Sequence, residues 1–208
     1  MNNTCYYQLI LDASGSMADG YDQTLSSLNE QLLMIRSLAT KHSDQKILMG
    51  LNDFSYDIRT IWPMTDPNSL QNLHEHDYQL RGNTALWDAI GATVSKLNAQ
   101  IGDEVSQDQA SVVVMILTDG YENASRYYTA STIRALMKDL KAKGNWEFRF
   151  IGADIDVENM ADSIGLDRKF AYQVSKSDMM EASVLMADEV DAHILQKKAM
   201  IAKHRRTK

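Results

Sequence analysis

Two short apolar runs limit most strongly what this chain can fold into. Tyr6–Leu11 and Val112–Leu117 are apolar or aromatic nearly throughout, without regular alternation with polar residues. This pattern is typical of central parallel strands that are covered by helices on both faces. We therefore expect both runs to be central strands. Phe148–Ile151, which ends at Gly152, is a third candidate.

Segments with helical periodicity lie between these runs. In each of them apolar residues recur every three or four positions, as on the buried face of an amphipathic helix. The three sets are Leu25, Leu28, Leu32, Ile35 and Ala39; Leu86, Ile90, Val94 and Leu97; and Ile133, Leu136, Met137 and Leu140. Strands that alternate with helices predict a Rossmann-like α/β sheet.

One pair of strands must be antiparallel. The strand-like runs 46–54 and 57–62 are separated only by Ser55 and Tyr56. A parallel crossover needs a dozen or more residues, so this link allows only a hairpin. The hairpin gives the sheet one antiparallel edge.

The last quarter of the chain predicts a short helix, a strand and a long helix. Asp156 can cap a helix that ends near Gly165, and Arg168–Val174 can form a last strand. Ser175 and Asp178 resemble a capping box at the start of the terminal helix. The apolar stripe of that helix comprises Met179, Met186, Val190, Ile194 and Ile201. The expected fold is a doubly wound, mostly parallel six-stranded sheet with one antiparallel edge strand and helices on both faces.

Length and composition indicate one globular domain over residues 1–208. The chain is 44% hydrophobic and 24% charged, and no linker, repeat or composition break divides it. Its start lacks the features of a signal peptide, and its apolar runs are too short to span a bilayer. Cys5 is the only cysteine, so no internal disulfide can form. These features predict a cytoplasmic protein.

Charge is distributed unevenly along the chain. The net charge of −7 combines +6 from residues 197–208 with −13 from the rest. The acidic body should repel nucleic acid and anionic membranes. We interpret the basic end as favourable charge at a helix C-terminus, with an anionic docking patch as the alternative. The basic residues are Lys197, Lys198, Lys203, Arg205, Arg206 and Lys208.

Oxygen-bearing side chains follow the two central strands. Asp12, Ser14 and Ser16 form a D-x-S-x-S motif after the first strand, and Asp119 follows the Val112–Leu117 run. Thr84 lies in a loop before a predicted helix. Ligand sites of doubly wound sheets lie at the carboxyl ends of strands, so these five side chains can converge. Hydroxyl and carboxylate oxygens are ligands for a divalent cation.

The mixture of neutral and charged oxygens indicates what such a site would do. Several carboxylates would neutralise the charge of a divalent cation, whereas hydroxyls hold the cation and leave it electrophilic. A site of this composition is suited to accept an external acidic group. The alternative interpretation is that Ser14 and Ser16 cap the following segment and Asp119 starts a turn.

The chain resembles the von Willebrand factor type A (VWA) domain family over nearly its entire length. The five residues match the metal-ion-dependent adhesion site (MIDAS) of that family in type and order. The resemblance implies Mg²⁺, or Mn²⁺ or Ca²⁺, held by Ser14, Ser16 and Thr84, with Asp12 and Asp119 often acting through waters. Asn83 stands where the family often has a second glycine, and asparagine tolerates left-handed backbone.

The resemblance also implies a function and partners. A partner protein would supply a Glu or Asp to the cation, and the chain would be a non-enzymatic adaptor or regulatory subunit, monomeric alone. Family members of this kind work with AAA-type ATPases. In some relatives the terminal helix, here 179–201, shifts when the metal site binds its ligand.

Enzymatic alternatives are weaker. A metal-assisted phosphohydrolase would use the same cation as a Lewis acid, but no base is evident beside it. Ser14 stands where a haloacid-dehalogenase phosphatase has its second Asp, and no histidine is tied by a motif to a serine nucleophile. His74 and His76 invite a zinc interpretation, which lacks a second half-motif. Partner choice would depend on loops near the site, which contain Asp19, Tyr21, Asp22, Tyr121, Glu122, Asn123, Arg126, Tyr127 and Tyr128.

Overall fold

Six strands form one sheet in the computed structural model, which describes residues 4–206. The strands are β1 (Thr4–Asp12), β2 (Lys46–Phe54), β3 (Ile58–Thr65), β4 (Ala110–Thr118), β5 (Trp146–Ala153) and β6 (Ala171–Val174). Their order is β3-β2-β1-β4-β5-β6, and only the β2–β3 pair is antiparallel. This confirms the predicted mostly parallel sheet with one antiparallel edge strand.

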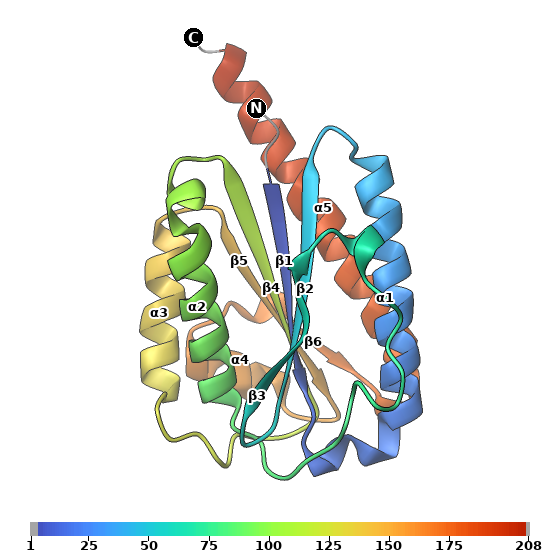
Figure 1. Ribbon diagram of the computed structural model, residues 1–208. Helices are drawn as coiled ribbons and strands as arrows, with labels where there is room; N and C mark the ends of the chain where they lie inside the picture. The colour runs from blue at the N-terminus through green and yellow to red at the C-terminus, as the bar shows by residue number, and fades with distance from the viewer. Residues whose placement is uncertain (1–3, 207–208) are drawn as a thin grey trace.

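Within residues 4–206, five α-helices cover the sheet. They are α1 (Tyr21–Lys41), α2 (Leu86–Ser106), α3 (Ala130–Ala142), α4 (Val157–Ile164) and α5 (Met179–Arg206). Helices α1 and α5 lie on one face of the sheet, and α2 and α3 lie on the other (Figure 1). The two-faced covering explains the apolar runs. Alternate residues of β1, such as Tyr7 and Ile10, pack into opposite cores.

The central strands place their carboxyl ends side by side. Strand β1 pairs with β2 on one side and with β4 on the other, and Leu11 is opposite Leu117. The chain passes from β1 to β2 on one side and returns past β1 to reach β4. The order in which the chain adds strands across the sheet therefore reverses between the parallel neighbours β1 and β4, and ligand sites of such sheets occur at this point.

The boundaries of some elements differ from the sequence prediction. Strand β3 begins at Ile58 and continues past Trp62 to Thr65, because the hairpin pairing extends through a register shift. Arg168–Phe170 is a short 3-10 turn and not the start of β6. Ser175 caps another 3-10 turn, Lys176–Asp178, through the Ser177 N–H, so the expected capping box with Asp178 is not formed. Further 3-10 turns are Gly15–Gly20 and Pro67–Ser69.

Helix α5 packs as its apolar stripe predicts. Met179, Met186, Val190 and Ile194 are each at most 1% exposed. The side chain of Ile201 lies outside the described part of the structure.

The basic end is partly paired with the body of the protein. The Lys197 ammonium donates to Asn145 at 2.8 Å, and Lys198 pairs with Asp44. The side chains of Lys203, Arg205 and Arg206, and all of Lys208, lie outside the described residues. None of the helices in the described region has the length and hydropathy needed to cross a membrane.

Candidate metal centre

The D-x-S-x-S motif forms the loop that leaves β1. The Ser14 N–H donates to Asp12 Oδ1 at 2.7 Å, and the Ser14 and Ser16 hydroxyl oxygens are 3.0 Å apart. Ser14 precedes the 3-10 turn 15–20 but makes no side-chain capping hydrogen bond. Its hydroxyl is therefore directed to the same place as that of Ser16, which disagrees with a capping role.

Asp119 and Thr118 join this loop from β4. The Ser16 hydroxyl donates to Asp119 Oδ1 at 2.6 Å, and the Thr118 hydroxyl donates to Asp12 Oδ2. Sequence reasoning missed Thr118, although it precedes Asp119 in the same motif. Its hydroxyl occupies one oxygen of Asp12 and so fixes the orientation of that carboxylate.

Thr84 reaches the centre from the loop before α2. Its N–H donates to the Asn123 side chain at 2.9 Å, and the Asn123 N–H donates to the Thr84 carbonyl at 3.0 Å. The Gly15 N–H donates to the Gly82 carbonyl at 3.0 Å, which ties the loop to the D-x-S-x-S motif. Positive φ angles occur elsewhere in the described chain but not at Asn83, so the loop needs no left-handed residue there.

Gly120 marks the point that these side chains surround. A Cβ atom at this glycine would lie 2.8 Å from Thr84 Oγ1 and 3.4 Å from both Asp12 Oδ2 and Ser16 Oγ. Side-chain oxygens from two separate segments thus lie around one small space that glycine leaves open at the end of a third segment, β4. The arrangement fits a hard divalent cation, because all the donors are hydroxyl or carboxylate oxygens.

Burial makes the centre unfavourable for uncompensated negative charge. The Asp12 side chain is fully buried, and this burial raises its pKa to about 6 from 3.8. Hydrogen bonds from Thr118 and Ser14 oppose the rise, whereas the charge of Asp119 adds to it. A bound cation would stabilise the ionised carboxylates.

Two carboxylates hold the loops around the centre. Asp88, at the start of α2, accepts hydrogen bonds of 2.8–2.9 Å from the N–H groups of Arg126, Tyr127 and Tyr128. Glu122 accepts hydrogen bonds from the Trp87, Ala124 and Ser125 N–H groups. These two carboxylates therefore attach the loop after β4 to α2.

A buried ion-pair cluster positions the loop before Thr84. The Asp53 side chain, 0% exposed, pairs with Arg59 at 2.5 Å and Arg81 at 2.9 Å. The Arg81 N–H donates to the Ala13 carbonyl at 2.8 Å, beside the motif. The Tyr78 hydroxyl donates to the Asp12 carbonyl at 2.7 Å. The sequence carries no local signal for these contacts, because they join residues from different segments.

Some tyrosines in the loops proposed to select a partner are exposed, and others are packed inside the protein. Tyr121 and Tyr127 are 55% and 84% exposed, and Tyr56 in the hairpin turn is 67% exposed. Tyr21 instead stacks on Tyr78, with ring centroids 5.4 Å apart. Exposed tyrosines near the centre are suited to contact a protein surface.

The residues of the zinc interpretation are not joined by further ligands in the way that the five candidate metal residues are. His74 and His76 stack with ring centroids 5.6 Å apart. No group of three or more His, Cys, Asp or Glu side chains that could hold a metal ion is found among the described residues. The candidate centre itself has only two carboxylates and depends on hydroxyl donors.

Ser111, His193 and Glu147 form a chain of contacts between α5 and the sheet, in which Ser111 and His193 are buried and Glu147 is partly exposed. His193 contacts Ser111 Oγ at 2.8 Å through Nε2 and Glu147 Oε1 at 2.9 Å through Nδ1. Although burial opposes it, contact with His193 and Arg149 lowers the pKa of Glu147 to about 2. Ser111 and His193 are each 1% exposed, so a substrate could not reach them. We interpret the set as a structural link between α5 and the sheet.

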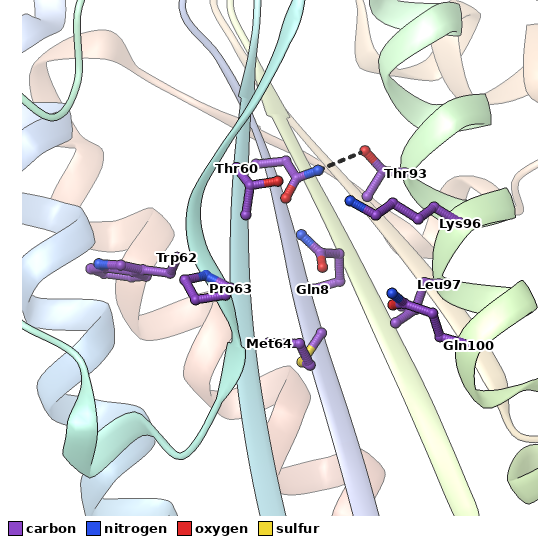
Figure 2. A pocket seen from close by; sticks show the side chains of 10 residues that line it. Gln8, Thr60, Trp62, Pro63, Met64, Thr93, Lys96, Leu97 and Gln100 are labelled. Carbon is purple, nitrogen blue, oxygen red and sulfur yellow. Dashed lines mark hydrogen bonds between the residues drawn. The ribbon is translucent and has the colours of Figure 1, made fainter.

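A hollow of about 150 Å³ lies between α2 and the edge strand β3 (Figure 2). Gln8, Asn52 and Thr93 line it together with residues of β3, and the Asn52 amide donates to the Thr93 hydroxyl. Lys96 extends into it from α2. None of the five candidate metal ligands lines this hollow, so it is separate from the metal centre.

Comparison with known proteins identifies the family. The family model of the von Willebrand factor type A domain matches residues 8–185. The chain belongs to the VWA domain family. A search of curated proteins found no match.

Solved structures share the VWA fold at low sequence identity. Proximal thread matrix protein 1 from the mussel byssus, solved with a zinc-occupied MIDAS motif, has 16% identity and a TM-score of 0.62, over 90% of this chain and 48% of that one. BatB from Bacteroides thetaiotaomicron has 15% identity and a TM-score of 0.59, over 91% and 98%. The pilus adhesin SpaC from Lactobacillus rhamnosus GG has 13% identity and a TM-score of 0.63, over 92% and 30%. This chain spans about half the length of the mussel protein.

Proposed function

We propose that this VWA domain is a non-enzymatic protein-binding module that captures an acidic residue of a partner through a divalent cation. The oxygens of Asp12, Ser16 and Thr84 around Gly120, with Asp119 joined to them through the Ser16 hydroxyl, carry the proposal. The assigned metal residues are Asp12, Ser14, Ser16, Thr84 and Asp119. Mg²⁺ is the preferred cation, with Mn²⁺ or Ca²⁺ as substitutes, and the zinc-occupied MIDAS of the mussel relative supports a divalent ion.

The composition of the ligand set favours binding of a partner's acidic residue over catalysis. Three of the five assigned ligands are neutral hydroxyls, so the ligands add no negative charge beyond that of the two carboxylates, and an open coordination position can accept another anion. A Glu or Asp of the partner would fill that position. The exposed rings of Tyr56, Tyr121 and Tyr127 would contact the protein surface around it.

The wider context is also part of the proposal. The chain would act as one domain, monomeric alone, and bind an effector such as an ATPase, as the family resemblance implies. We place it in the cytoplasm because Cys5 is its only cysteine and is free and buried. Two of the compared structures come from the mussel byssus and a bacterial pilus.

The proposal is tested by affinity capture from native lysate with Mg²⁺ or with excess EDTA. Bound proteins should differ between the two conditions, and Asp12→Ala combined with Ser14→Ala should abolish the Mg²⁺-dependent set. The control pair Asp139→Ala and Ser37→Ala, both at exposed helix positions, should leave it unchanged.

Two results would contradict the proposal. The first is capture that is undiminished in EDTA. The second is turnover of generic phosphate esters that is lost in Asp119→Ala, since this would favour a phosphohydrolase that uses the cation as a Lewis acid.

A further inference from the structure

Lys176 places an ammonium group against the metal centre. Its Nζ lies 2.7 Å from Asp119 Oδ2 and donates to the Ser16 carbonyl at 3.2 Å. The Asp119 contact is a close ion pair without an aligned hydrogen bond. The Asp119 side chain is 0% exposed and that of Lys176 is 24% exposed, so the pair is partly shielded from water.

The two oxygens of Asp119 have different neighbours. Oδ1 accepts the hydrogen bond from Ser16, whose hydroxyl belongs to the candidate ligand set, whereas Oδ2 faces Lys176. The ammonium can therefore remain beside Asp119 while the other oxygen serves the cation, directly or through water. Lys176 lies next to the ligand set without being part of it.

The backbone holds Lys176 in this position. Lys176 begins the 3-10 turn that precedes α5, and its N–H donates to Asp154 Oδ2 at 3.3 Å. Gly20, in the loop that carries Ser16, packs against this turn. A Cβ atom at Gly20 would lie 3.3 Å from the Lys176 carbonyl oxygen. Contact with Asp119 raises the pKa of Lys176 above its usual value, and the charges of Asp19 and Asp154 add to the rise.

The charge of the centre depends on this residue. Asp12 and Asp119 contribute two negative charges, and the hydroxyl ligands contribute none. The two ligand carboxylates and the Lys176 ammonium together sum to −1, so a bound divalent cation brings this set of groups to +1. Without the ammonium the cation-loaded centre would be neutral, and it would attract a carboxylate less strongly.

We propose that Lys176 sets the charge of the metal centre, weakening cation binding and strengthening the affinity of the cation-loaded centre for a carboxylate. This inference rests on the proposed function and deepens it. The ammonium repels the cation at short range in a partly buried site, where screening by water and salt is incomplete. The same repulsion leaves the bound cation more electrophilic toward the acidic group of a partner.

The first experiment measures Mg²⁺ affinity by isothermal titration calorimetry. Lys176→Met keeps most of the aliphatic side chain and removes the charge. It should tighten Mg²⁺ binding about tenfold, because one unit charge that repels the cation at short range is removed. Lys176→Arg keeps the charge and should resemble the wild type. Lys138→Met, an exposed position on α3, is the matched control and should have no effect.

The second experiment uses acetate as a carboxylate probe. With Mn²⁺ bound to equal occupancy, the acetate methyl proton signal should broaden more with the wild type than with Lys176→Met, because more acetate reaches the paramagnetic ion. Thermal unfolding in EDTA shows whether the variants fold. A purely structural role would lower stability in Lys176→Met without tightening Mg²⁺ binding.

The possible outcomes separate this inference from the proposed function. Tight wild-type Mg²⁺ binding that is unchanged or weakened in folded Lys176→Met would overturn the role of Lys176 alone. Equal acetate broadening in the two proteins would overturn its effect on carboxylate affinity. No Mg²⁺ binding by the wild type or any variant would overturn the proposed function and this inference with it.

Discussion

Replacing Asp12 with Asn should stabilise the cation-free domain even though it removes an assigned metal ligand. Burial raises the pKa of Asp12 to about 6 from 3.8 when no cation is present. Since the pKa is higher in the folded state, the folded state binds the proton more tightly than the unfolded state. At pH 7.5 the carboxylate is ionised in both states, and its burial disfavours folding.

The magnitude follows from the pKa difference and the hydrogen bonds. A rise of about two units corresponds to about 3 kcal/mol at pH 7.5. Asn can still accept from the Ser14 N–H, but its NH₂ group cannot accept from the Thr118 hydroxyl. That hydroxyl lies 3.1 Å from the Gly120 carbonyl and can donate there. The loss of the Thr118 hydrogen bond to residue 12 costs about 1 kcal/mol. Asp12→Asn should therefore raise the free energy of unfolding by about 2 kcal/mol.

Urea unfolding at pH 7.5 in EDTA, followed by tryptophan fluorescence, measures this difference. Asp139→Asn makes the same change at an exposed position of α3 and should have little effect. Mg²⁺ should stabilise the wild type but not Asp12→Asn, because the assigned ligand is missing. A variant that is no more stable than the wild type in EDTA would refute the argument from burial.

The pH dependence has a defined sign. As the pH falls through about 6, folded wild-type Asp12 takes up a proton and its unfavourable charge is removed. The advantage of Asp12→Asn should therefore shrink below pH 6 and be nearly absent by about pH 4. An advantage that stayed constant over this range would show that charge is not its cause.

Three further changes address the centre and its support. Gly120→Ala should weaken Mg²⁺ binding measured by calorimetry and leave the circular dichroism spectrum unchanged, because its Cβ would lie 2.8 Å from Thr84 Oγ1. Asp88→Ala should lower the free energy of unfolding by about 3 kcal/mol in urea, because the N–H groups of 126–128 lose their acceptor. His193→Leu should lower it by about 3 kcal/mol without changing Mg²⁺ affinity, because a buried polar network is broken.

Each of these predictions has an outcome that contradicts it. Wild-type Mg²⁺ affinity in Gly120→Ala would show that the cation does not lie beside this glycine. Full stability of Asp88→Ala would mean that the loop after β4 is held by other contacts. A loss of Mg²⁺ affinity in folded His193→Leu would contradict the purely structural role of the buried link under α5.

The fold and the meeting of the candidate ligands were predictable because their signals are local. The Tyr6–Leu11 run lies within β1, and its apolar character follows from the cores on both faces of the sheet. Asp12 and Asp119 each follow such a run, so their meeting requires only that β1 and β4 are neighbours. Thr84 was included because its loop precedes a predicted helix, and its match to the family motif agreed with that placement.

Contacts between distant segments were not predictable in the same way. The Lys176 ammonium meets Asp119 for two reasons. Strand β6 ends at the edge of the sheet where the candidate metal centre lies, and the lysine side chain is long enough to reach Asp119 from there. The Asp53–Arg81 pair likewise depends on how the hairpin and the following loop pack. No pattern of neighbouring residues specifies such pairs, so only the three-dimensional arrangement identifies them.

The hydrogen bond between Ser16 and Asp119 spans 103 residues of sequence. Ser16 and Asp119 can therefore meet only after β1 and β4 have paired. The pairing of strands so far apart in the sequence is a slow, non-local step in folding. A divalent cation would have little affinity for the nascent or unfolded chain and could not act as a template for early folding. Metal binding would instead require that the centre of the sheet is already complete. In pulse-labelled refolding, affinity for the cation should therefore appear with the last phase of sheet formation.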